Sequence, residues 1–180
     1  MGLTASQTGG HPAGLYKINC GEDVYLLSMH LTPGLTDAAN DTQRLNEIKK
    51  FCQYIIPYQA GNFLMMGDFN TVSPHDKWYY DGHKYPNMTS DPYQALRYLH
   101  DNTTLKDVIH ESYPGDFLSS VREETQRIDY MYASPKMIQR LKTADIMIDE
   151  WIKLEIGPLE GQYLCVPSDH RPIIADYSFE

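Results

Sequence analysis

The apolar residues in the first part of the chain follow the short alternating or continuous patterns that predict β-strands. A hairpin is predicted by LYKIN (15–19), a turn at GED (21–23) and the apolar run VYLLSMHL (24–31). The second of these strands is apolar along most of its length, so we expect it to be largely buried. It carries His30 at its end.

Further strands are predicted by other short apolar runs. The run NFLMMGDFN (62–70) predicts a buried strand that delivers Asp68 and Asn70 to its C-terminal tip. Three more strands are predicted towards the C-terminus, in RIDYMYAS (127–134), ADIMIDEW (144–151) and RPIIADYSF (171–179).

Apolar residues at helical spacing predict a helix between the first two of these regions. The helix runs from about Thr42 to Ile56, because leucine, isoleucine and cysteine recur on one face. Its N-cap is predicted to be Asn40 or Asp41, since short polar side chains accept hydrogen bonds from the first free amides. Pro57 follows as a stop signal.

The remaining segments complete the predicted fold. A second helix is expected at about 92–100 and a short helix or helical turn at 134–142, whereas 71–92 is expected to be a loop. Residues 1–14, rich in Gly, Ser, Thr and Pro, are expected to be flexible, and 15–180 to form one domain. Strands that alternate with helices indicate an α/β or layered α+β fold, a β-sheet with flanking helices.

The composition is that of a soluble globular protein. The chain has 180 residues, 42% of them hydrophobic and 22% charged. It contains no apolar run of about 18 residues, and its N-terminus lacks the basic and apolar stretches of a secretory signal, so the compartment is left open. The formal charge of −9 repels polyanions, which disfavours nucleic acid unless a basic groove or a bound cation reverses the sign locally.

The cysteines do not indicate a disulfide framework or a metal site. Cys20, Cys52 and Cys165 form no CxxC pair and cannot all pair within one chain. We therefore expect them to be buried thiols.

Polar side chains capable of catalysis or metal binding fall at the ends of four predicted strands. They are His30, Asp68, Asn70, Asp129, Asp169 and His170. Each residue is weak evidence for a functional site by itself, since a histidine at a strand end or an aspartate in a turn usually has a structural role. Together they are informative, because crowded carboxylates repel unless a cation or a histidinium neutralises them. A cluster rich in oxygen and without thiolates suits Mg²⁺ or Mn²⁺ better than zinc.

These segments resemble the signatures of a known family. GDFNTVSPHD, RIDYMYAS and SDHRPIIADY occur in the order and with the spacing found in the endonuclease/exonuclease/phosphatase family, which includes deoxyribonucleases, abasic-site endonucleases, sphingomyelinases and inositol-phosphate phosphatases. SMHLTPG, followed by Arg44, resembles the preceding histidine-bearing strand of the family. The resemblance extends from about Leu15 to Phe179. It implies a DNase-like four-layer sandwich or the C-terminal half of one.

The resemblance also implies a mechanism, in which a divalent cation polarises a phosphate ester and water attacks phosphorus in line with the leaving oxygen. His170 would hold the scissile phosphate, and Asp129 would orient and charge its imidazole. Asp169 would be a metal ligand.

Three further residues have roles implied by the same resemblance. Asp68 would position the attacking water or bind the metal, and Asn70 would donate a hydrogen bond to the phosphate or share the metal. His30 would contact the phosphate or help to protonate the leaving group. Positioning and electrostatics supply most of the rate in such chemistry.

Structural alternatives exist for several of these residues. Asp129 could instead pair with Arg127 or Arg122 on the surface, and Asp169 could cap backbone amides in a polar turn. Arg44 is expected to bridge elements rather than to act in the site. The aromatic segment 75–88 either packs its loop onto the body as a small aromatic core or exposes rings that would stack bases, seat a sugar or touch lipid.

The N-terminal end of the sequence departs from the family pattern. Upstream of the His30 strand the family carries an Asn and a metal-binding Glu, often in a Gln-Glu pair, whereas residues 1–19 contain no such pair. We therefore expect the chain to be a fragment of a longer protein, with weaker metal affinity. Half of a sandwich would expose an apolar sheet face, which favours self-association.

The sequence thus predicts hydrolysis of a phosphate ester by a phosphodiesterase or phosphatase that depends on Mg²⁺ or Mn²⁺. The acidic charge favours a phosphorylated small molecule or lipid headgroup as substrate. A nuclease of the same family is an alternative. A truncated, non-catalytic domain that binds phosphate or a partner is another.

Overall fold

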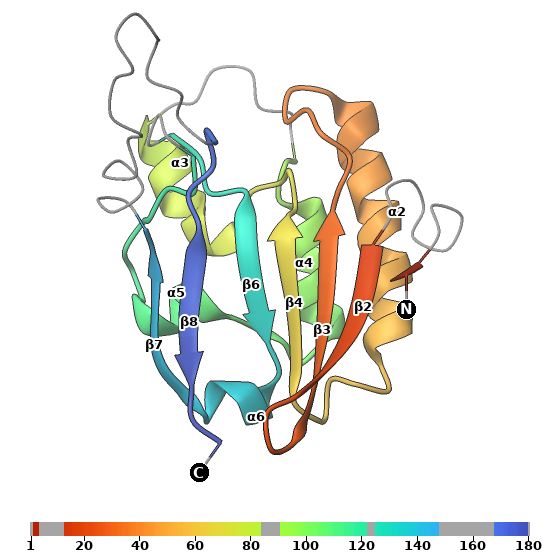
Figure 1. The fold of residues 1–180 in the computed structure, drawn as a ribbon. Helices are drawn as coiled ribbons and strands as arrows, with labels where there is room; N and C mark the ends of the chain where they lie inside the picture. The colour runs from red at the N-terminus through yellow and green to blue at the C-terminus, as the bar shows by residue number, and fades with distance from the viewer. Residues whose placement is uncertain (1, 4–12, 84–90, 122–124, 148–167, 180) are drawn as a thin grey trace, which may run out of the picture.

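The computed structural model describes residues 2–3, 13–83, 91–121, 125–147 and 168–179. These residues form one six-stranded sheet and one two-stranded sheet, with helices packed around them (Figure 1). The expected fold class, a β-sheet with flanking helices, is confirmed.

The larger sheet carries the residues of interest. Its strands are β1 (Gly2–Leu3), β2 (Ala13–Asn19), β3 (Asp23–His30), β4 (Phe63–Asp68), β5 (Lys106–Asp107) and β6 (Asp129–Ala133). They lie in the order β1-β2-β3-β4-β6-β5. The predicted β2-β3 hairpin is antiparallel, β4 runs parallel to β3, and β6 runs antiparallel to β4.

The smaller sheet pairs β7 (Leu141–Ile146) with β8 (Ile173–Tyr177) in antiparallel fashion. It lies in front of the β6 side of the larger sheet in Figure 1. Met131 and Ala133 of β6 are buried there with Ala144 of β7 in one apolar cluster. The two sheets therefore share a core on this side only.

Helices α2 (Ala38–Ile55) and α4 (Gln94–Asn102) cover the opposite face of the larger sheet. The shorter helices are η1 (Pro74–Asp76), α3 (Lys77–His83), α5 (Val108–Ser112) and α6 (Pro135–Ile138). Of these, α5 and α6 pack in the apolar cluster that the two sheets share. Phe51 and Ile55 of α2 and Leu96 of α4 are buried against Met65 of β4. Burying one such side chain stabilises the fold by about 1.5–3 kcal/mol. None of the helices that the structure describes is long and apolar enough to cross a membrane.

The first long helix begins one turn earlier than predicted. Asp37 is its N-cap, and the Asp37 side chain accepts a hydrogen bond from the amide of Ala39 at 2.8 Å. The predicted caps, Asn40 and Asp41, lie inside the helix. The prediction was wrong because the first turn is polar and lacks apolar periodicity, and because Asp41 instead forms a buried ion pair with Arg44.

Other elements also differ from the predictions. The expected loop 71–92 contains η1 and α3, and β7 begins at Leu141 rather than at Ala144. The predicted end of that strand, 148–151, lies outside the described residues. The short elements β5 and α5 were not predicted. Asp107 caps α5 by accepting hydrogen bonds from two amides. A helix of this length is too short to show a helical period of apolar residues in the sequence.

The N-terminal segment and the cysteines gave mixed outcomes. Gly2 and Leu3 pair with β2, while residues 1 and 4–12 lie outside the described part of the chain. Cys52 is buried, as predicted. Cys20 is exposed, so that prediction was wrong, because it lies in the turn of the hairpin; Cys165 is not described.

The aromatic segment forms a small core, which was one of its two predicted roles. Tyr79 stacks on Phe117 with ring centroids 3.6 Å apart, and Tyr80 is buried beside Tyr93. Trp78 differs, because 53% of its side chain is exposed. Residues 84–88 lie outside the described part of the chain.

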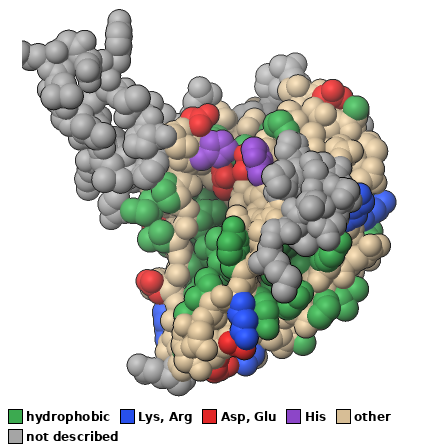
Figure 2. Space-filling view, turned by 45° about the vertical axis from the view of Figure 1, so that its right-hand side comes forward, with side chains coloured by type: hydrophobic (Ala, Val, Ile, Leu, Met, Phe, Trp, Pro, Cys, Tyr) green, Lys and Arg blue, Asp and Glu red, His purple; other side chains and the backbone are tan. Residues whose placement is uncertain are grey.

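One face of β2 has no layer of described residues over it, whereas Val24 of β3 and Leu64 of β4 on the same side are buried in the cluster shared with the smaller sheet. The register places Tyr16 beside Leu26 and Leu26 beside Leu64, so these side chains share a face. Tyr16 is 53% exposed and Ile18, on the same face of β2, is 43% exposed. Figure 2 shows hydrophobic side chains on this side of the molecule below a group of Asp and His side chains. Among the described residues, apolar exposure on this face is therefore concentrated on β2, and the predicted uncovered face is present only in part.

A buried ion network joins the elements around β6. Arg127, just before β6, is fully buried, and its Nε lies 2.8 Å from Oδ2 of Asp76 in η1. Its Nη2 lies 2.8 Å from Oδ2 of Asp107, the cap of α5. The guanidinium also stacks over the ring of Tyr130. One cation thus connects η1, α5 and the start of β6.

We expect Arg127→Met to destabilise the fold by about 3–5 kcal/mol, because it leaves two buried carboxylates without their cation. Lys77→Met is the matched control, since Lys77 pairs with Asp81 on the exposed surface of α3 and such pairs contribute less than about 1 kcal/mol. Urea unfolding measures both variants. Equal losses in the two variants would contradict a structural role for the buried network.

Candidate functional site

Three of the predicted site residues lie side by side in one row across the larger sheet. His30 at the end of β3 is in register with Asp68 at the end of β4, and Asp68 is in register with Asp129 at the start of β6. Neighbours in register project from the same face of a sheet. The row lies at the edge where parallel β3 and β4 end and antiparallel β6 begins, on the face opposite α2 and α4.

The GDFN segment has local properties that present Asp68. Gly67 has a φ of 141°, and a Cβ at this position would lie 1.8 Å from the carbonyl oxygen of Met29, so only glycine fits. Asn70 has a φ of 46°, a left-handed conformation that asparagine tolerates. Its amide donates to Asp68 Oδ1 at 2.8 Å, and its Nδ2 donates to the Leu31 carbonyl at 3.1 Å. Asn70 therefore ties Asp68 to the end of β3.

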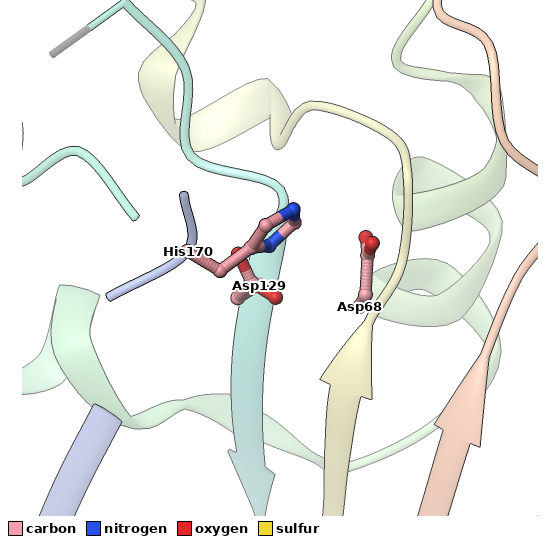
Figure 3. Close-up of side chains that lie close together, drawn as sticks. All are labelled: Asp68, Asp129 and His170. Carbon is pink, nitrogen blue, oxygen red and sulfur yellow. The ribbon is translucent and has the colours of Figure 1, made fainter. Parts of the chain in front are cut away.

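Asp129 and His170 form a hydrogen-bonded pair. His170 Nδ1 lies 2.8 Å from Asp129 Oδ2, and the ring lies above the start of β6, facing the side on which Asp68 stands (Figure 3). Ligand atoms of Asp68, Asp129 and His170 all lie within 4.8 Å of one another. The structure therefore brings together residues that are far apart in sequence.

The electrostatics of the site follow from partial burial and crowding. Burial raises the pKa of the Asp68 carboxyl, although Asn70 and the two histidines oppose the shift. Burial also raises the pKa of Asp129, where Ser120 opposes the shift and Asp68 adds to it. Burial lowers the pKa of His170, but the carboxylates of Asp129 and Asp68 outweigh it, so the net shift is upward. The site therefore holds excess negative charge that favours a cation.

The remaining predicted residues lie nearer the surface. His30 Nε2 is 3.5 Å from Asp68 Oδ2, and its side chain is 57% exposed. Asp169 is exposed and lies outside the group whose ligand atoms converge, although its charge helps to raise the pKa of His170. The structure thus groups Asp68, Asp129 and His170, sets His30 beside them, and leaves Asp169 at the rim.

The donor set fits a hard divalent cation. Asp68 and Asp129 offer carboxylate oxygens, which are the ligands that Mg²⁺ and Mn²⁺ prefer. His170 is suited to a different task, because its Nδ1 is engaged by Asp129 and its raised pKa favours the imidazolium, which donates hydrogen bonds and cannot bind a metal.

A cleft opens beside this group. It has a volume of about 280 Å³ and runs along the uncovered face past Asp68 and Asp129. Met66, Met131 and Ile173 form an apolar part of its wall. The carboxylates are therefore accessible from one side and desolvated on the other.

The structural alternatives for two arginines are resolved. Arg127 pairs with Asp76 and Asp107 rather than with Asp129, while Arg122 lies outside the described residues. Arg44 donates to the carbonyls of Thr32 and Gly34 from inside α2. Arg44 therefore bridges elements, as predicted.

Ser120 is a site neighbour that the sequence did not reveal. Its hydroxyl donates to Asp129 Oδ2 at 2.7 Å. Ser120 belongs to no predicted strand or helix, and a serine in a polar stretch carries no periodic signal. Only the folded chain shows this contact.

Comparison with known proteins supports the fold. No protein-family model matches the sequence, and no curated protein matches it significantly. Solved structures do match. A 3′ phosphatase, NExo, from Neisseria, bound to a product DNA hairpin, is 21% identical with a TM-score of 0.69, over 94% of this chain and 65% of that one.

Two further structures extend this result. An AP endonuclease from Archaeoglobus fulgidus is 17% identical with a TM-score of 0.68, over 91% of this chain and 64% of that one. An endonuclease/exonuclease/phosphatase from Beutenbergia cavernae is 13% identical with a TM-score of 0.57, over 97% and 43%. The chain therefore has the fold of endonuclease/exonuclease/phosphatase-type proteins, as its motifs predicted. It spans less than two thirds of the length of each of these three structures.

We expect Asp129→Asn to lower the pKa of His170, because the carboxylate that outweighs burial of the ring is removed. Since the wild-type pKa is raised on folding, the pair stabilises the fold below the ordinary histidine pKa and this stabilisation is lost as pH rises through the folded value. NMR titration of the His170 ring proton measures the pKa in the wild type and in the variant, and urea unfolding at several pH values measures the stabilisation. Asp145→Asn, an exposed change on β7, is the control. An unchanged His170 pKa in Asp129→Asn would contradict this assignment.

Proposed function

We propose that the chain belongs to a hydrolase that cleaves phosphate esters with the help of Mg²⁺ or Mn²⁺. One observation carries the proposal. At an open edge of a DNase-like sheet, Asp68 and Asp129 lie in register, and His170 is hydrogen-bonded to Asp129 at 2.8 Å. Clustered acids beside a charged imidazole form a site for a phosphate group and its cation.

His170 would bind the phosphate undergoing reaction. With Nδ1 directed at Asp129, the imidazolium has only its Nε2–H to offer a phosphate oxygen. Its raised pKa favours the charged imidazolium, which would stabilise the negative charge that grows on phosphorus. Asp129 would orient the ring and hold it in this tautomer.

Asp68 would position the attacking water. Its Oδ1 accepts from the amide of Asn70, and burial raises its pKa towards the range in which a carboxylate accepts a proton. His30, 3.5 Å from the same carboxylate and mostly exposed, would contact the phosphate or protonate the leaving group. Each role uses a side chain at the same edge of the sheet.

In this proposal Asp68 would hold the cation with Asn70 beside it, Asp129 offers a second carboxylate oxygen nearby, and Asp169 lies at the rim. A bound Mg²⁺ or Mn²⁺ would polarise the phosphate and offset the charge of the carboxylates. The rest of the chemistry needs only the positioning and hydrogen bonds of the side chains above.

Two substrate classes have support. The formal charge of −9 favours a phosphorylated small molecule or lipid headgroup over a polyanion. The second candidate is DNA, because the structurally similar proteins include a 3′ phosphatase bound to a DNA hairpin and an AP endonuclease. A domain that binds phosphate or a partner without catalysis is the alternative to both enzyme functions.

We expect the chain to hydrolyse a chromogenic bis-aryl phosphodiester in the presence of Mg²⁺ or Mn²⁺. Hydrolysis should stop when the metal is chelated. Asp68→Ala and His170→Ala should each lower kcat by about 10²–10⁴-fold, because each removes a group that acts on the reacting phosphate. Asp145→Ala and His83→Ala, exposed on β7 and α3, are matched controls. A phosphorylated inositol and a 3′-phosphorylated DNA hairpin, assayed in parallel, separate the two substrate classes.

The outcomes divide the three functions. Faster turnover of the inositol phosphate supports the small-molecule substrate, and faster turnover of the hairpin supports DNA. No metal-dependent turnover of any substrate would contradict the enzyme proposal. Phosphate binding that is lost in His170→Ala would then support a binding domain.

Self-association through the uncovered sheet face stays a prediction. In sedimentation velocity we expect the weight-average mass to rise with concentration, because Tyr16 and Ile18 expose apolar surface on one strand. Joint replacement of both by threonine should reduce the effect. Trp78→Ser, which removes a similarly exposed ring from α3, should not. A monodisperse monomer at all concentrations would refute the prediction.

A further inference from the structure

We propose that Ser120 is a positioning residue of the site, which holds the Asp129 carboxylate in the orientation that engages His170. The inference rests on the function proposed above for its link to catalysis, but the geometry that carries it is independent of any substrate. Ser120 is fully buried between β6 and the segment that carries His170.

The hydroxyl of Ser120 has one available arrangement. It accepts hydrogen bonds from the amides of Ile128 and Asp129, each at 3.0 Å. A hydroxyl oxygen has two lone pairs and one proton, so these amides occupy its acceptor capacity. Its proton is then committed to Asp129 Oδ2, at 2.7 Å. The amide groups thus dictate the direction in which the hydroxyl donates.

The same carboxylate oxygen receives the imidazole. Asp129 Oδ2 lies 2.8 Å from His170 Nδ1 and 2.7 Å from Ser120 Oγ. The terminal torsion of an aspartate is broad, so a carboxylate held by one partner can turn. Two donors on one oxygen fix that torsion. Ser120 therefore decides which way Asp129 faces.

The main chain of Ser120 holds the other partner. Its carbonyl accepts from the amide of Arg171 at 2.8 Å, and the next residue, Val121, forms an antiparallel bridge with His170. The side chain of Ser120 thus positions the acid while its backbone positions the segment of the histidine. One residue sets the spacing of two groups that are 41 positions apart in the chain.

Ser119 offers a matched control in the same segment. It is 5% exposed, and its hydroxyl also forms hydrogen bonds with main-chain groups, donating to the carbonyls of Val121 and Gln126. It makes no hydrogen bond to Asp129 among those that the structure describes. Ser119→Ala therefore reproduces the structural loss of Ser120→Ala without touching the acid.

The first readout is spectroscopic and needs no substrate. In protein labelled with ¹⁵N-histidine, the proton on His170 Nδ1 should give a downfield resonance that is shifted or lost in Ser120→Ala and kept in Ser119→Ala. The same resonance in both variants would overturn the proposal. This readout stands even if the chain hydrolyses nothing, so failure of the proposed function is distinguished from failure of this inference.

The second readout is kinetic, with the bis-aryl phosphodiester and Mn²⁺. Ser120→Ala should lower kcat by about 10–100-fold with KM changed less than about 3-fold, as removal of supporting hydrogen bonds does in other sites. In the Asp129→Asn background the same change should lower kcat by less than about 3-fold, because Ser120 acts through Asp129. Equal losses in both backgrounds would reduce Ser120 to a general structural role. If Ser120→Ala does not fold, Ser120→Cys, with a weak donor of similar size, is measured in the same way.

Discussion

The structure depends on the register of three adjacent strands, β3, β4 and β6. Their pairing places His30, Asp68 and Asp129 in one row, and the apolar face that packs on α2 and α4 holds that pairing in place. Leu27 and Met65 must face the helices on one side, so a slip of one residue would bury Asp68 among apolar side chains. The apolar pattern of the strands therefore enforces the position of the polar row.

This constraint explains why acidic groups of like charge are held close together. The carboxylates are partly buried beside the apolar side chains of Met66 and Met131, so desolvation raises the pKa of Asp68 and Asp129. Arg127, the nearest buried cation in sequence, is committed to Asp76 and Asp107. Relief comes from His170 and, in the proposed function, from a divalent cation. The free energy of unfolding that the crowded carboxylates cost is thus linked, in the proposed function, to binding of the cation.

Much of the fold could be predicted from local sequence patterns, and the elements that were predicted wrongly or missed share one cause. The hairpin, β4, β6 and β8 were predicted because their apolar runs are short and bounded by turn residues. The start of α2 and the elements α3, β5 and α5 were not, because their first turns are polar or too short for a period. Asp37 and Asp107 start two of these helices by accepting amide hydrogen bonds. A cap of this kind is one residue long and resembles any other turn aspartate.

For the candidate site, too, some features follow from residues that are neighbours in the chain, and others follow only from contacts between distant segments. The sequence by itself determined which residues are candidates for the site, because Gly67 and Asn70 suit the local backbone conformation and Asp129 and His170 lie in recognisable motifs. Tertiary structure alone decided that Asp169 stays at the rim and that Ser120 supports Asp129. The physical reason is that backbone conformation is set by neighbours in the chain, whereas a hydrogen bond between side chains is set by packing of segments that the chain order does not bring together.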